Sequence, residues 1–221
     1  QVKMSDKMRE SLQKSDWMFS GIKTFHELNE AFPQLTDEDG GRKPLERFLS
    51  DDRKVDETYN RNYLRAEYNF AQASAEMAGK WERIEEDGDE YLLQYRTAGD
   101  DKVRPEHASL NGVTLPPSDT FWDEYYPPNG WNCRCSVAQV RRDKFPQTDR
   151  EEAFTRARKA LAKDKKGMFR FNPGKQERTF PAYNPYTISK CKNCPKAKNL
   201  AAGISANQLC EACALIQKCV V

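Results

Sequence analysis

The feature that most constrains the fold is an apolar stripe that runs through residues 56–86. Its members recur at steps of three and four residues, the spacing of one face of an α-helix. They are Tyr59, Tyr63, Ala66, Phe70, Ala73, Met77, Trp81 and Ile84. The stripe therefore predicts one long core helix, which the acidic, glycine-containing run at residues 85–89 ends.

The segments on either side of this helix predict an α+β chain. Residues 1–55 have the pattern of short helices broken by turns, with one helical face that Pro33 ends and a second helical start at Leu45. Residues 91–96 and 136–140 have the composition of strands, and the loops between them are rich in proline and aromatic residues. We therefore expect N-terminal helices including one long helix, then a small antiparallel sheet with long ordered loops.

Beyond the strands, the chain becomes basic. A short amphipathic helix is predicted from Phe154, Ala157 and Leu161, which share one side, and the turn-rich residues 163–190 are interpreted as a linker. We accordingly divide the chain into a helical N-terminal segment (1–55), a central domain (56–145), a basic helix with a linker (146–190) and a cysteine-rich module (191–221).

Five of the seven cysteines lie in the last 31 residues. Cys191 and Cys194 form one CxxC pair, and after fifteen intervening residues Cys210 and Cys213 form another. Four thiolates at this spacing can enclose a tetrahedral zinc ion, which predicts a small zinc-ribbon-like module with a structural role. Cys219 either replaces one of the four or is a free thiol. The alternative is that the cysteines are simply reduced or disulfide-linked; the absence of a recognisable secretory leader favours a reducing compartment and metal.

A second candidate site combines His107 with Cys133 and Cys135. One imidazole and two thiolates can be three zinc ligands, and Asp100 or Asp101 is a candidate for the fourth. A lone histidine is more often a hydrogen-bonded structural residue, so that alternative stays open. The same residues would also permit a thiolate nucleophile activated by an imidazole, although the sequence supplies no evident orienting group or oxyanion hole.

The net charge of +2 conceals an asymmetry, because residues 141–198 contain 17 Lys and Arg against 6 Asp and Glu. This excess is either a solvated face or a surface for nucleic acid or an acidic protein, and the interleaved Phe169, Phe171 and Phe180 favour the second interpretation. The candidate contact residues are Arg156, Lys159, Lys163, Lys165, Lys166 and Arg170.

Other function classes are disfavoured by what the sequence lacks. No run approaches the roughly 20 apolar residues that cross a bilayer, so we expect no membrane association. No phosphate-binding loop or dinucleotide fingerprint occurs, and the chain has only two histidines, which limits acid–base chemistry near neutral pH. We therefore expect neither an enzyme nor a small-molecule substrate.

An ordered set of motifs between Tyr95 and Val140 resembles the Mu protein F-like head morphogenesis domain of tailed phages and prophages. The motifs are Asp100-Asp101-x-Val103-Arg104-Pro105-x-His107, Leu115-Pro116, Phe121-Trp122 and Pro127-Pro128-Asn129-Gly130-Trp131-x-Cys133-Arg134-Cys135. The resemblance covers residues 56–140 well and residues 1–55 more loosely. It implies that His107, Cys133 and Cys135 are the defining site of the domain.

The resemblance also implies a role. Members of this family are minor capsid proteins, present in few copies and associated with the portal, which act in head assembly or genome delivery. The implied partners are the portal or other head proteins, with packaged DNA as a further candidate, and the implied location is the virion, assembled in the bacterial cytoplasm. Two alternatives remain. One is a toxin-like or nucleic-acid-processing enzyme that uses His107 with Cys133 or Cys135, and the other is a DNA-binding module within residues 163–221.

Overall fold

The computed structural model describes residues 3–31, 37–39, 41–165 and 167–181, apart from some side chains within the helices. These residues fall into two compact units. The sheet unit comprises residues 3–13 and 69–181, and the described part of the helical unit is residues 14–68. None of the helices in the described ranges combines the length and the apolar character needed to span a membrane.

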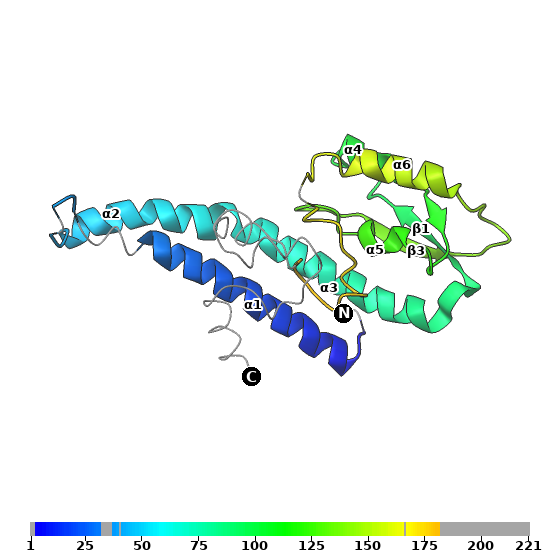
Figure 1. The fold of residues 1–221 in the computed structure, drawn as a ribbon, viewed down its shortest axis with the longest axis horizontal. Helices are drawn as coiled ribbons and strands as arrows, with labels where there is room; N and C mark the ends of the chain where they lie inside the picture. Colours follow the sequence, from blue (N-terminus) through cyan, green and yellow to red (C-terminus); the bar gives the residue numbers. More distant parts are fainter. Residues whose placement is uncertain (1–2, 32–36, 40, 166, 182–221) are drawn as a thin grey trace. The chain divides into compact units, whose positions relative to one another are not determined.

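The first helix, α1, extends over Asp6–Ala31 as one continuous element (Figure 1). The prediction of short helices broken by turns is wrong here. The reason is local, because this stretch contains no proline and its single glycine, Gly21, is a weakening that a long helix tolerates. The predicted second start is confirmed, since α2 begins at Leu45 and ends at Asp56.

The predicted long helix is confirmed over most of its length. A π-helical turn, Glu57–Asn62, follows α2, and α3 then extends over Leu64–Asp87 until a 3₁₀ turn, Gly88–Glu90, ends it. Phe70, Met77, Trp81 and Ile84 of the apolar stripe are buried, and Ala73 between them is half-buried. Tyr63, at the start of the stripe, is instead 50% exposed.

Three antiparallel strands form the sheet, in the order β2-β1-β3. Their bounds are Leu92–Arg96 for β1, Thr114–Leu115 for β2 and Ser136–Val140 for β3. In register, Leu93 faces Leu115 on one side, and Tyr95 faces Val137 on the other. Both predicted strands are confirmed. The two-residue β2 was not predicted, because so short a segment carries no periodicity.

The core of the sheet unit is built from the loops as much as from the strands. Two one-turn helices, α4 (Pro105–Ala108) and α5 (Phe121–Glu124), lie between β1 and β3, and α6 (Arg150–Ala160) follows β3. The helix α6 begins at an Asp149 cap that accepts a hydrogen bond from the Glu152 amide, and it packs beside α4 (Figure 1). The side chains that fill this core are Met77, Trp81, Ile84, Leu93, Tyr95, Leu110, Val113, Leu115, Phe121, Trp122, Tyr125, Tyr126, Val137, Ala153, Ala157, Ala160 and Leu161.

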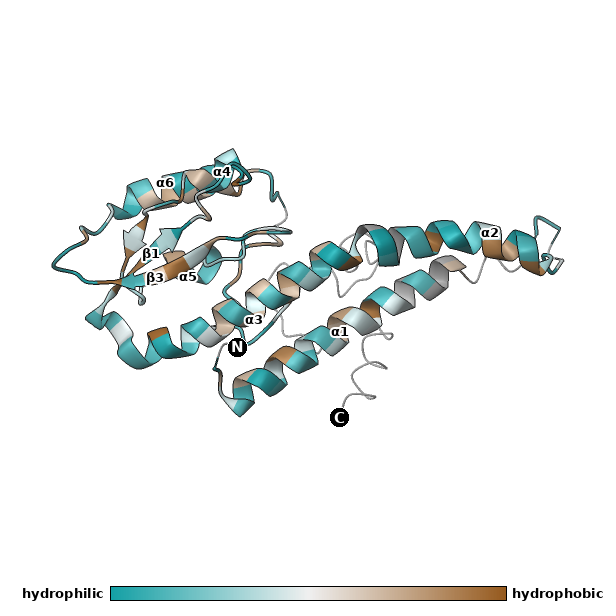
Figure 2. Ribbon diagram, turned by 180° about the vertical axis from the view of Figure 1, so that it is seen from behind, coloured by the Kyte–Doolittle hydropathy of each residue, from teal (hydrophilic) through white to brown (hydrophobic). Residues whose placement is uncertain are grey.

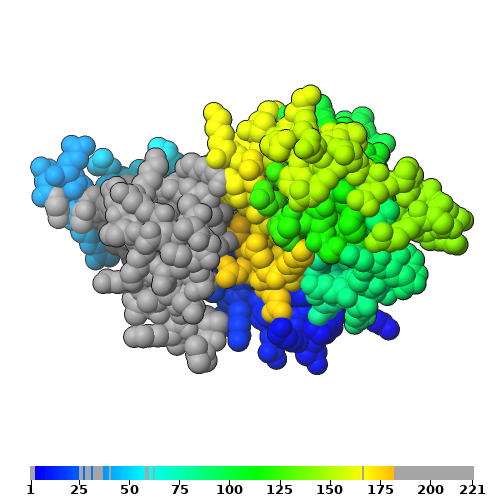
Figure 3. All heavy atoms as spheres, turned by 45° about the vertical axis from the view of Figure 1, so that its right-hand side comes forward, coloured from blue at the N-terminus to red at the C-terminus, as the bar shows by residue number. Residues whose placement is uncertain are grey.

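Residues 167–181 belong to the sheet unit, although the sequence interpretation treats them as part of a linker. Phe171 and Phe180 are buried, and the Phe70 ring lies 5.7, 6.2 and 5.8 Å from those of Phe169, Phe171 and Phe180. Figure 3 shows this segment, in gold, seated among the atoms of the sheet unit. Phe171 and Phe180 are therefore core residues and are not free to stack on nucleic acid, whereas Phe169 is half-buried beside them. The predicted module at 191–221 lies outside the described residues.

Candidate metal centre

The first ligand candidate, His107, is held by the short helix α4. Arg104 adopts an extended backbone before the helix, and Pro105 occupies its first turn, where a missing amide proton costs nothing. The Leu110 amide then donates to the His107 carbonyl at 3.0 Å, which turns the chain back toward β2. The imidazole is buried as a result, with 5% of the residue exposed.

The two cysteines lie where the loop after Gly130 enters β3. The Cys133 amide donates to the Gly130 carbonyl at 3.1 Å, and Asn132 adopts a left-handed conformation with a φ of 55°. Asparagine is among the few residues that tolerate this conformation. Cys133 and Cys135 follow directly, just before β3 begins at Ser136, and the Sγ atoms of both lie 3.7 Å from Nδ1 of His107. Cys133 and Cys135 therefore present their sulfurs together, and both residues are buried.

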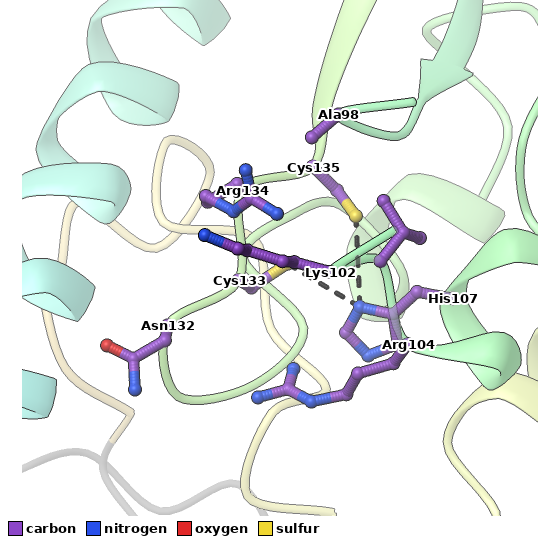
Figure 4. Close-up of a pocket in the computed structure, with 9 residues that line it drawn as sticks. Ala98, Lys102, Arg104, His107, Asn132, Cys133, Arg134 and Cys135 are labelled. Carbon is purple, nitrogen blue, oxygen red and sulfur yellow. Dashed lines mark hydrogen bonds between the residues drawn. The ribbon is translucent and has the colours of Figure 1, made fainter. Parts of the chain in front are cut away.

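These three side chains converge within bonding range of one ion. The Nδ1 atom of His107 lies 3.7 Å from the Sγ atom of Cys133 and 3.7 Å from that of Cys135, and the three atoms all lie within 4.8 Å of one another (Figure 4). Tetrahedral zinc with normal bond lengths separates a sulfur and a nitrogen ligand by about 3.6 Å. The arrangement can therefore hold a metal ion with little movement.

The electrostatics of the two thiols are strongly linked. The hydrogen bond from Cys135 lowers the pKa of Cys133 well below its usual value, and His107 adds to this effect against the opposing influence of burial. The same hydrogen bond, together with burial, raises the pKa of Cys135. The protein alone thus favours one thiolate over two. A divalent cation would supply the positive charge that a second thiolate needs.

A cavity of about 250 Å³ opens beside the three ligand candidates. Three cationic side chains line it, those of Lys102, Arg104 and Arg134, and no acidic side chain does. Figure 4 shows Arg104 near the His107 ring and Arg134 beside the cysteines. A cationic wall beside a buried metal site favours anionic occupants.

Asp100, one of the two candidates for the fourth ligand, is bound to Arg134 instead. Both carboxylate oxygens of Asp100 accept hydrogen bonds from the Arg134 guanidinium, at 2.6 and 2.7 Å, which lowers the pKa of Asp100 to about 2. Neither Asp100 nor Asp101 joins the group of potential metal ligands among the described residues. Arg134 thus pairs with a carboxylate next to the site. Arg104 instead donates to the carbonyl of Trp131.

Several basic residues that were predicted to contact a partner are engaged within the chain. Arg156 donates to the carbonyls of Ser109 and Asn111, at 2.6 and 2.9 Å, so it joins α6 to the turn after α4. Lys163 pairs with Glu106. Arg156 therefore supports the fold, whereas the Lys163 side chain is 87% exposed and its surface ion pair contributes little to stability. Contact by either residue with a partner stays a prediction.

The other predicted contact residues differ in their exposure to solvent. Lys159 and Lys165 are exposed, and Arg170 is half-buried. Lys166 lies outside the described residues, as do Cys191, Cys194, Cys210, Cys213 and Cys219. Contact by these side chains, and zinc binding by the C-terminal cysteines, remain predictions.

Sequence analysis missed the second layer of the site. Tyr95 is fully buried on β1, and this burial, with a smaller contribution from the two cysteines, raises its pKa well above the usual value. Its hydroxyl donates to the Asn129 side chain at 2.8 Å, which anchors the loop that carries the cysteines. Only its place inside the Tyr95–Val140 motif pointed to it.

Comparison with known proteins identifies the family. The model of the family described as "Phage Mu protein F like protein" matches residues 28–138, half of the chain. The chain is 36% identical over 104 residues to the "Putative capsid assembly protein F" of Escherichia phage Mu, a match that covers 47% of this chain and 21% of that protein.

Further relatives extend the comparison. The "Mu-like prophage FluMu F protein" of Haemophilus influenzae is 28% identical over 154 residues, which cover 66% of this chain and 33% of that protein. An uncharacterised protein of Methanocaldococcus jannaschii is 40% identical over 47 residues, 21% of this chain and 7% of that protein. The chain thus spans at most a third of the length of the relatives that it matches, and no solved structure matches it. Because the family model covers His107, Cys133 and Cys135 together with the long helix, the chain belongs to the Phage Mu protein F like family.

Proposed function

We propose that this chain is a minor capsid protein that acts in the assembly of a phage or prophage head. The observation that carries the proposal is the family match over residues 28–138, together with a relative whose name describes capsid assembly. Neither of the two phage relatives is named as an enzyme. The proposed place of action is the virion, assembled in the cytoplasm of the bacterial host.

The proposed partner is the portal or a neighbouring head protein, with a role in head assembly or genome delivery. The helical unit is the part suited to such a contact, because it exposes large apolar side chains. Its exposed residues are Trp17, Leu45, Leu49, Tyr63, Leu64 and Tyr68. Leu45 and Leu49 on α2, and Leu64 and Tyr68 on α3, are each four residues apart and so adjoin on one helix face. Adjoining apolar side chains that are exposed are typical of a protein interface.

The proposed role of the metal centre is to hold the loops of the sheet unit together. His107 comes from the loop after β1, whereas Cys133 and Cys135 come from the loop before β3, so one ion would join two long connections. Zinc fits a donor set of one nitrogen and two sulfurs. Residues 56–145 remain the proposed head morphogenesis domain, followed by the basic segment at 146–190.

The C-terminal part is proposed to bind a second zinc ion through Cys191, Cys194, Cys210 and Cys213, and to approach packaged DNA with the basic segment before it. Lys159 and Lys165 are exposed residues of that segment. Salt-sensitive DNA binding by the full chain, reduced when both lysines are changed to glutamine, would support the contact. Binding that is insensitive to salt, or absent, would reassign the segment to protein contact.

The experiment that tests the function is quantitative mass spectrometry of purified particles from a strain that produces them. A few copies of this chain per particle would support the proposal, and cross-linking within those particles would identify its neighbour. Absence from particles combined with presence in the lysate would contradict a capsid role.

One observation favours a second candidate, a toxin-like or nucleic-acid-processing enzyme. His107 lies equally close to both cysteines, and the pKa of Cys133 is lowered, which is what a thiolate nucleophile requires. The change His107→Ala separates the two candidates. In an assembly protein it impairs folding or head formation, whereas in an enzyme it leaves the fold intact and abolishes an activity.

A further inference from the structure

The arrangement around the metal centre points to the ligand that completes it. We infer that the centre is open, and that its fourth ligand is a carboxylate group from outside the described residues, received in the cavity beside His107. This inference rests on the proposed metal centre and differs from the site that the sequence suggests, in which Asp100 or Asp101 is the fourth ligand. A site of three protein ligands with a free position is the arrangement in which zinc accepts a further molecule.

The first argument is the number of ligands. Among the described residues, His107, Cys133 and Cys135 are the only His, Cys, Asp and Glu side chains that come together as a potential metal site. The nearest acidic candidate, Asp100, is held by two hydrogen bonds to Arg134. Tetrahedral zinc with these three ligands still requires one more donor.

The second argument is the space next to the ligands. The cavity of about 250 Å³ is lined by all three ligand residues, so an ion between them faces it directly. Part of the remaining wall is apolar, formed by Ala98 and Val103. The cavity is large enough for a carboxylate side chain, which occupies only a fraction of this volume.

The third argument is charge. A zinc ion with two thiolates and one neutral imidazole carries no net charge, so the cationic side chains of the wall set the preference for an anion. Lys102 and Arg104 carry this preference, because the charge of Arg134 is already paired with Asp100. Arg104 stands close to the metal side of the cavity. Gly130 lies against both Arg104 and His107: a Cβ atom added at Gly130 would lie 3.0 Å from Nη1 of Arg104 and 3.8 Å from Cε1 of His107.

The fourth argument is the chemistry of the donors. An arginine guanidinium binds a carboxylate through parallel hydrogen bonds, and Arg134 already binds Asp100 in this way at the rim of the cavity. Aspartate and glutamate oxygens are also normal zinc ligands. A glutamate or aspartate of a neighbouring head protein would bind the ion and lie beside the cationic groups of Lys102 and Arg104.

The test uses the full chain loaded with Co²⁺ in place of zinc, because thiolate-bound Co²⁺ has visible absorption bands that respond to a change of ligand. Acetate is the carboxylate probe, and inorganic phosphate is the comparison. We expect acetate to shift the bands saturably, and the shift to be absent in the Cys133→Ser/Cys135→Ser variant. Chain that shows bands but no shift with acetate would overturn the inference, as would a shift with phosphate alone.

Failure of the metal centre itself would look different, because the wild-type chain and the Cys133→Ser/Cys135→Ser variant would then have identical cobalt spectra before any probe is added. A milder variant tests the cationic wall without touching a ligand. Lys102→Gln should weaken acetate binding about fivefold at unchanged cobalt content, as expected for the loss of one nearby charge. The matched change Lys144→Gln removes an exposed charge that does not line the cavity, and should leave acetate binding unchanged.

Discussion

The sheet unit and the helical unit treat their large side chains in opposite ways. The largest fully buried side chains, those of Trp81, Trp122, Tyr95, Tyr126, Phe70 and Phe121, all belong to the sheet unit. The large apolar side chains that are exposed in the described residues all belong to the helical unit. Figure 2 shows brown, hydrophobic residues recurring along the otherwise hydrophilic helix α2. The sheet unit thus buries its large side chains within itself, whereas the helical unit exposes those that we propose to contact a partner.

The two units also differ in how they use polar side chains. In the sheet unit, buried polar side chains form hydrogen bonds to the backbone of the loops. In the core, for example, the Asn172 side chain donates to the Trp122 carbonyl at 3.0 Å. In the helical unit a buried ion pair joins α1 to α3, with 2.7 Å between Lys23 and Glu67. Buried charge pairs give less stability than an apolar core but are costly to break.

The largest effect is expected at the metal centre. His107→Ala or Cys133→Ser would remove a ligand and the ion, and should lower the free energy of unfolding of the sheet unit by at least about 4 kcal/mol, because the loss of a structural metal is among the most damaging changes. Thermal unfolding with metal analysis checks this. A chelator should reproduce the effect in the unaltered chain, and a variant as stable as the original would refute the role of the ion.

The helical unit should be broken most easily at its buried ion pair. Lys23→Met leaves Glu67 buried without its lysine, and should cost about 3 kcal/mol. The double change Lys23→Met/Glu67→Leu should recover most of this loss, since two apolar side chains can replace the pair. Chemical denaturation of the three variants is the measurement, and a double variant no better than the single one would show that the pair is not coupled in this way.

The close packing of the sheet unit is tested at Gly174. A Cβ atom here would lie 2.2 Å from the Cβ atom of Trp81, which a packed core cannot accommodate without movement. Gly174→Ala should therefore cost about 2 kcal/mol by overpacking. Gln176→Ala, at an exposed position of the same segment, should be nearly neutral in the same unfolding assay. Equal stability of the two variants would show that the backbone around Gly174 can move away from Trp81 at little cost, and would contradict close packing here.

The exposed aromatics of the helical unit should matter for binding and not for stability. Trp17 and Tyr68 are 63% and 66% exposed, so Trp17→Ser/Tyr68→Ser should change the free energy of unfolding by no more than about 0.5 kcal/mol per site. Incorporation into particles, measured by mass spectrometry, should fall severalfold. Normal incorporation would remove the argument for a docking surface on this unit.

The smallest effects are shifts in the pKa of two carboxylates. Hydrogen bonds from Ser118 hold the pKa of Asp89 below its ordinary value of 3.8 in the sheet unit, and Lys43 does the same for Asp51 in the helical unit. Because both values are lowered, their contribution to stability is present above the ordinary pKa and is lost as the pH falls through the lowered one. Added salt should raise the pKa of Asp51 more than that of Asp89, since salt screens an ion pair more than a neutral donor. Carboxyl NMR titrations would show this, and equal responses would contradict it.

Regular elements were predictable because their periodicity is local. The stripe through Phe70, Met77 and Trp81, the strand at 136–140 and the start of α2 at Leu45 all stand as predicted. The convergence of His107 with Cys133 and Cys135 could be suggested from residue type, because one imidazole and two thiolates are typical zinc ligands. The spacing of the two cysteines adds to this, since residues two apart on an extended chain lie on the same side.

The rest depended on contacts between distant residues. Nothing local shows that Asp100 would bind Arg134 and so be withdrawn from the metal, or that Arg156 would serve two carbonyls of another loop. The segment 167–181 has a linker's composition, and it becomes part of the core only because Phe70 and its neighbours accept its aromatic rings. Polar composition therefore hid the packing of this segment.

The most direct test of the account is the metal content of the full chain with Cys191, Cys194, Cys210 and Cys213 all changed to serine. The account predicts that this variant, purified under reducing conditions, retains one zinc ion per chain, and that the further change His107→Ala removes it together with the stability of the sheet unit. The account would be contradicted if the four-serine variant held no zinc and unfolded at the same temperature with and without the further change His107→Ala.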